Sequence, residues 1–170
     1  MSERVEVIDP VTGATLDTVE RARVRSENLW HRSVFVVLLR SDGLVVTHRR
    51  ADWKDMWPGR WDCAFGGVVA AGETTAVAAE RELAEEAGLH GVALEHLGHG
   101  MHDDEDVREV GDVYLARWDG PLAPADGEVV ELGTVPLAEL DAWLGDTPVV
   151  PDACTIVAPL LRTLVDGAGS

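Results

Sequence analysis

The spacing of apolar residues predicts short strands and helices that alternate along the chain. Residues 34–39 form an unbroken apolar and β-branched run, as expected for a strand that is buried on both faces. Turn residues at 41–43 follow it, and residues 44–48 are expected to return as its antiparallel partner. Two apolar stretches around the turn cluster at 9–13 predict a smaller N-terminal hairpin over about residues 5–19.

Three helices are expected, and the one over residues 76–87 has the clearest ends. Thr74 or Thr75 can cap its first turn, because a hydroxyl there can accept a free backbone N–H. Gly88 before Leu89 supplies a left-handed stop with an apolar contact.

The two later helices are expected in the C-terminal part of the chain. Pro136 opens the first, which runs toward Leu144, and the second covers about residues 152–165. Pro159 lies inside the last helix and predicts a kink or a break there, because proline lacks the N–H that a regular helix bonds.

Further strands are expected between these helices. They cover residues 64–70, 91–102, 107–118 and 129–135, and the acidic loop 103–106 joins the second of them to the third. Strands and helices in this order predict an α/β fold, an α/β/α sandwich with a mixed sheet. The length fits a single domain over residues 1–170.

The charge of the chain excludes one class of partner. The formal net charge is −17 at pH 7, and Lys54 is the single lysine. Binding of nucleic acid through its phosphates needs clustered Lys and Arg, so no nucleic-acid partner is expected. An acidic protein that acts on phosphate compounds needs divalent cations between its carboxylates and the phosphates, so the charge is compatible with a metal enzyme.

Neither a membrane span nor a secretory signal is expected. No apolar run approaches the roughly 18–20 residues that cross a bilayer, and residues 1–6 lack the basic and then apolar pattern of a signal. Cys63 and Cys154 show no CxxC or Cys/His ligand spacing, which fits a reducing compartment. We therefore expect a cytoplasmic protein with no disulfide and no membrane partner.

One face of the helix over residues 76–87 carries three glutamates. A helix advances about 100° per residue, so Glu82, Glu85 and Glu86 fall within a roughly 100° arc, away from the apolar face. Like charges at these spacings repel by roughly a few tenths of a kcal/mol per pair unless a cation or solvent relieves them. A solvated surface and a cation-binding face are both consistent with the helix alone.

The sequence around this helix is more specific. The segment Gly67-Val-Val-Ala-Ala-Gly72-Glu73 is followed after seven residues by Arg81-Glu82-Leu83-Ala84-Glu85-Glu86-Ala87-Gly88-Leu89. Residues 67–89 thus resemble the box of the Nudix family, which reads Gly, five residues, Glu, seven residues, Arg-Glu-apolar-any-Glu-Glu-any-Gly-apolar. Every specified position is filled, so the resemblance implies a Nudix-type α/β/α sandwich.

The resemblance implies a metal site at the matching positions. Glu82, Glu85 and Glu86 would ligate Mg²⁺ or Mn²⁺, with the carbonyl of Gly67 as a further ligand. The chemistry agrees, because hard divalent ions prefer oxygen ligands, and magnesium keeps waters and substrate phosphate oxygens in its shell.

The resemblance also implies an orienting pair. Glu73 and Arg81 would lie buried and hold the loop against the helix, so that the metal ligands are correctly placed. An ordinary surface ion pair is the alternative for these two residues. Gly67 and Gly72 would allow close backbone approach and the turn of the loop.

Weaker similarity extends over most of the remaining chain. Residues 29–33, 48–50, 56–62 and 147–152 resemble Nudix proteins related to isopentenyl diphosphate isomerase. In that isomerase a catalytic cysteine precedes the box glycine and a metal-binding histidine follows it, whereas this chain has Gly66 and Val68. These departures argue against isomerisation of a prenyl diphosphate.

Hydrolysis of a diphosphate linkage by water needs a general base as well as cations on the phosphate oxygens. Glu128 is favoured as this base, because relatives of the isomerase place a functional glutamate in a comparable Glu-Val segment. The alternatives are Glu105, Glu109 and Glu131.

Other side chains have two interpretations each. Arg49 and Arg50 can bind substrate phosphates or simply balance nearby acids. Trp57, like Trp53 and Trp61, can stack on a base, line an apolar pocket or pack in a loop.

The histidines and Cys63 are expected to be structural. His31 matches a metal ligand of the isomerase, but its histidine partners are missing, so a hydrogen-bonded structural role is favoured. His96, His99 and His102 recur every third residue, which on a strand defeats a common metal site. Cys63 is expected to be a small core residue.

The sequence as a whole predicts an Mg²⁺- or Mn²⁺-dependent hydrolase that cleaves a diphosphate linkage. Its substrate would be a small molecule, a nucleoside diphosphate derivative or a similar organic pyrophosphate. Two alternatives remain, an isomerase-like enzyme and a non-catalytic, nucleotide-binding Nudix sensor, although a sensor usually has a decayed box. Relatives are often homodimers, so the resemblance allows a homodimer without requiring one.

Overall fold

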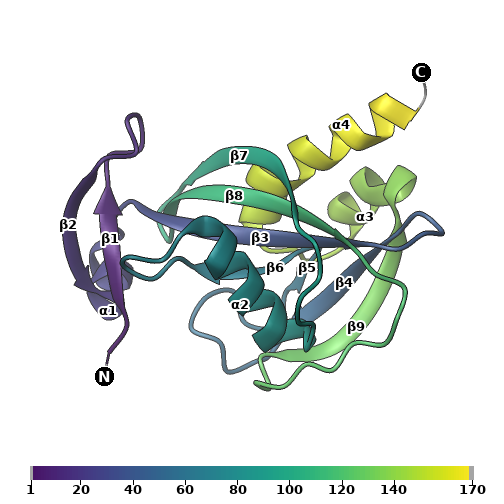
Figure 1. Ribbon diagram of the computed structural model, residues 1–170, viewed down its shortest axis with the longest axis horizontal. Helices are drawn as coiled ribbons and strands as arrows, with labels where there is room; N and C mark the ends of the chain where they lie inside the picture. The colour runs from purple at the N-terminus through teal and green to yellow at the C-terminus, as the bar shows by residue number, and fades with distance from the viewer. Residues whose placement is uncertain (1, 169–170) are drawn as a thin grey trace.

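The main sheet is organised around β3 (His31–Leu39), which pairs in parallel with β8 (Arg108–Arg117) and antiparallel with its other neighbours (Figure 1). The computed structural model describes residues 2–168, and within them this sheet has seven strands. One path of pairing runs β5-β4-β3-β8-β7, while β6 pairs with β3 and β9 with β4. The expected mixed sheet is confirmed.

The remaining strands lie close to their expected positions. Their bounds are β4 (Leu44–Arg50), β5 (Trp61–Asp62), β6 (Phe65–Val68), β7 (Glu95–Asp103) and β9 (Val129–Pro136). The β3–β4 hairpin forms through the pair Leu39 and Val45, and β4 then pairs along its length with β9. The strand expected from residue 91 begins at Glu95, because Gly91 turns the chain with φ 68°.

The two faces of the sheet carry separate cores. Along β3, Val34, Val36 and Leu38 pack toward α2 (Thr75–Ala87), whereas Phe35 and Val37 pack toward the C-terminal helices. Successive side chains of a strand point to opposite faces, so the uninterrupted apolar run serves both cores. This arrangement confirms the α/β/α sandwich.

The helix α2 has the expected ends. The Thr74 hydroxyl accepts the backbone N–H of Val77 at 3.2 Å, and Gly88 ends the helix with φ 71°. Ala79, Leu83 and two further alanines pack on the sheet, and the neighbouring glutamate face lies against β6, where Glu82 is close to Gly67. The cap and the stop therefore place the glutamates of the box beside the strands.

The C-terminal helices pack on the other face of the sheet. A 3-10 turn (η1, Leu137–Glu139) leads into α3 (Leu140–Asp146), and a π-helical segment (η2, Ala153–Val157) leads into α4 (Ala158–Ala168). At Pro159, where a kink or a break was expected, the helix is not broken, because α4 runs through this residue, but a π-helical irregularity directly precedes α4. The π-helical segment just before the proline accommodates the missing N–H.

The N-terminal hairpin is confirmed as β1 (Arg4–Ile8) and β2 (Thr15–Glu20), which form a separate two-stranded sheet. Sequence reasoning missed the helix that follows, α1 (Arg21–Glu27). Val24 of α1 joins a small core with Val5 of β1, and Val68 of β6 packs in the same core. Thus α1 lies next to the strand that contains Gly67. Among residues 2–168, no helix is long and apolar enough to cross a membrane.

Candidate active site

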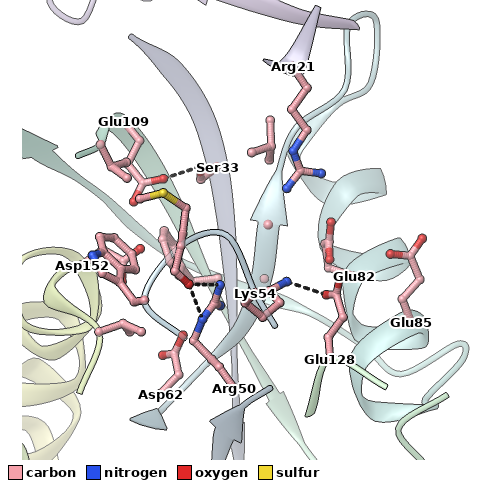
Figure 2. A pocket seen from close by; sticks show the side chains of 18 of the residues that line it. Arg21, Ser33, Arg50, Lys54, Asp62, Glu82, Glu85, Glu109, Glu128 and Asp152 are labelled. Carbon is pink, nitrogen blue, oxygen red and sulfur yellow. Dashed lines mark hydrogen bonds and ion pairs between the residues drawn. The ribbon is translucent and has the colours of Figure 1, made fainter. Parts of the chain in front are cut away.

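A pocket of about 370 Å³ lies where β3, β6, α1, α2 and the start of β8 meet. The irregular loop over residues 51–60 contributes to its wall. Carboxyl groups gather at two separate places in this pocket, as Figure 2 shows. The first group, here called the α2 carboxylates, consists of Glu82 and Glu85, which line the pocket, and of Glu86 on the same helix, which is buried outside the lining.

Two of the α2 carboxylates are almost fully buried. Glu82 is 8% exposed and Glu86 is 4% exposed, and the backbone N–H of Gly66 donates to Glu86 at 3.1 Å. Burial raises the pKa of Glu82 to about 6. Burial and, next, the charge of Glu82 raise the pKa of Glu86 well above its usual range. Full ionisation of both groups therefore requires additional positive charge.

The strand that faces these carboxylates has two adjacent glycines with different constraints. A Cβ at Gly67 would lie 2.5 Å from Glu82 Oε1, so glycine lets the strand approach this carboxylate closely. A Cβ at Gly66 would lie 1.9 Å from the carbonyl oxygen of Val34. No side chain fits at Gly66 while β6 stays paired with β3.

Arg81 and Glu73 form a bidentate pair. Arg81 Nε and Nη2 donate to the two oxygens of Glu73, each at 2.9 Å, and Nη2 also donates to the Val68 carbonyl at 3.2 Å. Arg81 Nη1 donates to Glu82 Oε1 at 2.7 Å. The hydrogen bond from Arg81 lowers the pKa of Glu73. Both side chains are partly buried. Through these hydrogen bonds the pair connects the loop that contains Glu73 with β6 and with Glu82.

Cations approach the α2 carboxylates from two other elements. Lys54, in the irregular loop, lies 2.8 Å from Glu128 and its charge also acts on Glu86. Arg21, at the start of α1, is directed toward the pocket in Figure 2, and its charge favours the ionised form of Glu82. Both arginine and lysine side chains here can contact phosphate oxygens of a bound substrate.

A second group of carboxyl side chains, the distal cluster, lies on the side of the pocket away from α2 (Figure 2). It consists of Asp62, Glu109 and Asp152, which are 7%, 4% and 6% exposed. Burial raises the pKa of Asp62 to about 7, and burial followed by the charge of Glu109 raises the pKa of Asp152 well above its usual range. These three groups come from β5, β8 and the helical turn before η2.

The structure separates the two arginines that were expected to bind phosphates. Arg50 lines the pocket and donates from Nε and Nη2 to the Met56 carbonyl, at 3.2 and 2.9 Å. Arg49 is absent from the pocket lining and forms ion pairs with Glu131 and Asp52. The alternation of side chains along β4 explains the difference.

Of the other side chains that were expected at the site, some line the pocket and others lie outside it. Trp57 lines the pocket, as do Glu128, Glu109 and Glu85. Glu131 pairs with Arg49, and Glu105 is exposed in the loop between β7 and β8, so neither belongs to the pocket lining.

The histidines have structural contacts. The Nδ1 of His31 lies 2.9 Å from the Leu29 carbonyl, and burial lowers the pKa of this imidazole. His96 contacts Asp112 at 2.8 Å on the exposed side of β7, whereas His102 is buried between Thr155 and Asp104. Cys63 is fully buried in a core, as expected.

Sequence reasoning missed several pocket residues. Arg21 and Arg25 belong to the unexpected helix α1, and Asp62 and Asp152 were not singled out. For Asp62 and Asp152 a weak signal was available, since each is an acidic residue next to a buried, apolar segment. Their meeting in one pocket depends on the fold and has no local signal.

The donor set at α2 fits a divalent cation. Among residues 2–168, no three His, Cys, Asp or Glu side chains are grouped so that they could hold a metal by themselves. Magnesium, however, needs few protein carboxylates because substrate phosphates and waters complete its shell. Glu82 and Glu86 supply hard oxygen atoms, burial raises their pKa values so that a cation would favour their ionised forms, and the close approach of Gly67 brings its backbone beside Glu82.

Known proteins resemble this chain in sequence and in structure. Residues 29–153 match the model of the NUDIX domain. The uncharacterized Nudix hydrolase SCO1686 of Streptomyces coelicolor is 36% identical over 164 residues, which cover 94% of this chain and 91% of that protein.

Two solved structures share the fold. The crystal structure of DR0079 from Deinococcus radiodurans has a TM-score of 0.77 at 21% identity, and the match covers 95% of this chain and 98% of that one. The NUDIX domain of Shewanella oneidensis NrtR, solved with ADP ribose, has a TM-score of 0.63 at 17% identity, covering 86% and 99%. The protein therefore belongs to the Nudix hydrolase family, whose members generally require divalent metal ions and act on nucleoside diphosphate derivatives.

Proposed function

We propose that this protein hydrolyses a diphosphate linkage in a nucleoside diphosphate derivative or a similar organic pyrophosphate, with Mg²⁺ or Mn²⁺. The observation that carries the proposal is the pair of buried carboxyl groups on α2, Glu82 beside Gly67 at the wall of the pocket and Glu86 bonded to the N–H of Gly66. Two buried acids next to each other are unfavourable as ions unless positive charge binds there. A pocket of this volume accommodates a small molecule.

The divalent cation would be held by Glu82, Glu86 and Glu85, with the carbonyl of Gly67. When bound, it would neutralise charge on the phosphate oxygens and favour attack by water. Its charge would also favour the ionised forms of the buried carboxyl groups, whose pKa values burial raises. Glu85, which is half exposed, would interact from the solvent side of the site.

The chain's own cations would bind the diphosphate group. Arg21 and Lys54 lie at the α2 side of the pocket, and Arg50 lies between this side and the distal cluster. Three cations around a narrow space fix the position of a diphosphate and so reduce the entropic cost of reaching the transition state. Arg81 and Glu73 would act as a positioning pair, because Arg81 bonds to Glu73 and to Glu82 and so orients Glu82.

Glu128 remains our choice for the general base. It lines the same pocket, and Lys54 holds its carboxylate at 2.8 Å, close to Glu86. Glu109 is less suitable because it lies in the distal cluster and accepts a hydrogen bond from Ser33. A carboxylate at the position of Glu128 can take a proton from an attacking water that lies between it and the substrate.

The isomerase alternative is disfavoured by a specific observation. The position that would need the catalytic cysteine is Gly66, where a Cβ would lie 1.9 Å from the Val34 carbonyl oxygen. A reactive side chain at this position would require a different backbone path.

The test is release of phosphate or nucleotide from a panel of nucleoside di- and triphosphates, nucleotide sugars, dinucleotide cofactors and prenyl diphosphates, with and without Mg²⁺. Cleavage of at least one diphosphate linkage that requires the metal and falls in Glu128→Gln is expected. Tight nucleotide binding without any cleavage would instead favour the alternative of a non-catalytic, nucleotide-binding sensor. Interconversion of prenyl diphosphates would establish the isomerase.

A further inference from the structure

The N-terminal unit of β1, β2 and α1 contributes side chains to the pocket from outside the segment that matches the family. That match begins at residue 29, whereas α1 covers Arg21–Glu27. Val24 anchors α1 in a small core that includes Val68 of β6, the strand that contains Gly67. The unit is therefore fixed against the strand beside the α2 carboxylates, and residues of α1 form part of the pocket wall.

Two arginines of α1, Arg21 and Arg25, line this wall. They are four residues apart, so their side chains lie on the same face of the helix, one turn from each other. Like charges at this spacing repel and destabilise a helix. Burial and, next, the charge of Arg21 lower the pKa of Arg25. An anion bound between the two guanidinium groups would relieve this repulsion.

The guanidinium of Arg25 is incompletely paired within the chain, whereas Arg21 donates to Glu3 at 2.8 Å. Among residues 2–168, Arg25 Nε is buried and has no hydrogen-bond partner. Its ion pair with Asp55 spans 3.8 Å, which is beyond hydrogen-bonding distance, and 68% of the Asp55 side chain is exposed. The charge of Glu109 also acts on Arg25, but Glu109 Oε2 accepts from Ser33. Unpaired buried donors are rare in folded proteins, so Arg25 is positioned to donate to a ligand in the pocket.

A third guanidinium group borders the same space. Arg50 enters the pocket from β4, on a different side from Arg21 (Figure 2), and its charge also lowers the pKa of Arg25. Burial raises the pKa values of Asp62 and Asp152, which lie nearby, and so disfavours their ionised forms. Positive charge therefore gathers locally in a chain whose net charge is −17, which favours an anionic ligand at this place.

We propose that Arg25, together with Arg21, binds a phosphoryl group beyond the linkage that is cleaved, so that the substrates carry a chain of three phosphoryl groups. This inference rests on the proposed function, because it names the substrate class of the same site. Lys54 and Arg50 would bind the cleaved diphosphate, and Arg25 extends this set of cations by one helical turn from Arg21. The guanidinium fork matches two oxygens of a phosphate, whose charge exceeds that of a carboxylate.

The test compares the binding of two probes that water cannot split. Methylenediphosphonate has two phosphoryl groups joined by a methylene bridge, and its homologue with two methylene bridges has three. Both are titrated calorimetrically in the presence of Mg²⁺, and the ratio of their dissociation constants is the measured preference. Each probe also binds Mg²⁺ in solution, but this contribution is the same for every variant, so changes in the ratio report the protein.

Variants assign the preference to Arg25. Arg25→Gln should weaken binding of the three-group probe by about tenfold or more, as for a lost charge-assisted hydrogen bond, and of the two-group probe by much less. Arg23→Gln, an exposed arginine of the same helix outside the pocket lining, makes the same change in net charge and should leave the ratio unaltered. Equal weakening of both probes by Arg25→Gln, or the same ratio in the two variants, would overturn the proposal.

Stability separates a binding role of Arg25 from a structural one. Arg25→Gln should unfold at the same or a higher urea concentration than the unaltered chain, because it removes the repulsion from Arg21. A clear loss of stability together with an unchanged ratio would mean that Arg25 serves the fold.

Arg25→Lys covers the case in which Arg25→Gln does not fold. It keeps the charge but loses the fork of donors, so its ratio should lie between those of the unaltered chain and of Arg23→Gln on one side and of a chain without preference on the other. A full ratio in Arg25→Lys would contradict the proposal.

Failure of the proposed hydrolysis would appear separately, as the absence of metal-dependent cleavage across the nucleotide panel. The two probes contain no cleavable linkage, so their titration reports the contribution of Arg25 in either case.

Discussion

The two groups of acidic side chains in the pocket differ in how fully they are balanced. Among the α2 carboxylates, Glu82 accepts from Arg81, and Glu86 accepts from the Gly66 N–H within reach of the Lys54 charge. In the distal cluster the hydrogen-bond partners are neutral or acidic: Ser33 donates to Glu109, the Ala64 N–H donates to Asp62, and Asp152 shares a hydrogen bond with Glu109. The first group is therefore oriented by charged and backbone donors of the chain, whereas in the second burial raises the pKa of Asp62 and of Asp152.

The largest effect is expected from Glu86→Gln, which tests whether the α2 side performs the chemistry. The amide keeps an acceptor for Gly66 but cannot supply the negative charge that a divalent ion needs. We expect kcat to fall by about 10²- to 10⁴-fold with little loss of stability, since interactions with a metal ion are worth several kcal/mol in the transition state.

The matched control is Glu80→Gln, an exposed glutamate of the same helix, and its steady-state rate should equal that of the unaltered chain. If both variants hydrolyse the substrate at similar rates, the α2 carboxylates are not the catalytic group.

A smaller effect, on stability, is expected when Asp62 of the distal cluster is replaced, and it should appear only in a defined pH range. Burial raises the pKa of Asp62 from 3.8 to about 7, so the folded state binds the proton more tightly than the unfolded state. The stability from this group is complete below pH 4 and is lost as the pH rises toward 7. Asp62→Asn removes that loss and should gain roughly 2–4 kcal/mol relative to the unaltered chain above pH 7, but little near pH 4.

Urea unfolding of both proteins across this pH range measures the difference, with the exposed Asp106→Asn as control. A variant whose loss of stability grows as the pH rises would show that Asp62 is ionised and stabilising in the folded protein.

A substitution in the pair of Arg81 and Glu73 should lower kcat by less than the loss of a metal ligand does. Arg81→Lys retains the charge but loses the bidentate contact with Glu73 and the simultaneous bond to Glu82. We expect kcat to fall about 10- to 100-fold while KM changes less, because the ligands are misplaced and the substrate contacts remain. Steady-state kinetics decide, and an unchanged kcat would reduce the pair to a surface ion bridge.

The smallest effect is expected from Arg49, which the structure places outside the pocket. Arg49→Ala should change kcat/KM by less than about twofold, as for most surface substitutions. Arg50→Ala, one residue along β4, should raise KM substantially because its guanidinium lines the pocket. Equal effects of the two variants would contradict the assignment of opposite strand faces.

The two clusters also differ in how far the sequence predicts them. Glu82, Glu85 and Glu86 lie within one helix, so the helical repeat and a capping threonine predict their common face without knowledge of the rest of the fold. The distal cluster joins residues 62, 109 and 152, and its assembly requires the parallel pairing of β3 with β8 and the packing of the C-terminal helix. Long-range packing of this kind leaves no local pattern.

The same reasoning accounts for the elements that sequence patterns missed or misjudged. Helix α1 is short and buries Val24 alone, so it has no apolar stripe to reveal it. Pro159 was expected to kink or break the last helix; a π-helical segment does precede it, but the helix continues through the proline. In both cases the helix depends on contacts with the rest of the fold, which the local sequence does not show.

The central claim is that the divalent ion binds to the α2 carboxylates and not to the distal cluster. Binding of Mn²⁺, followed by the loss of the free-ion electron paramagnetic resonance signal, tests it in the unaltered chain, in Glu86→Gln and in Asp152→Asn. We predict that Glu86→Gln weakens Mn²⁺ binding strongly and that Asp152→Asn leaves it unchanged. Strong weakening by Asp152→Asn with normal binding in Glu86→Gln would contradict the account.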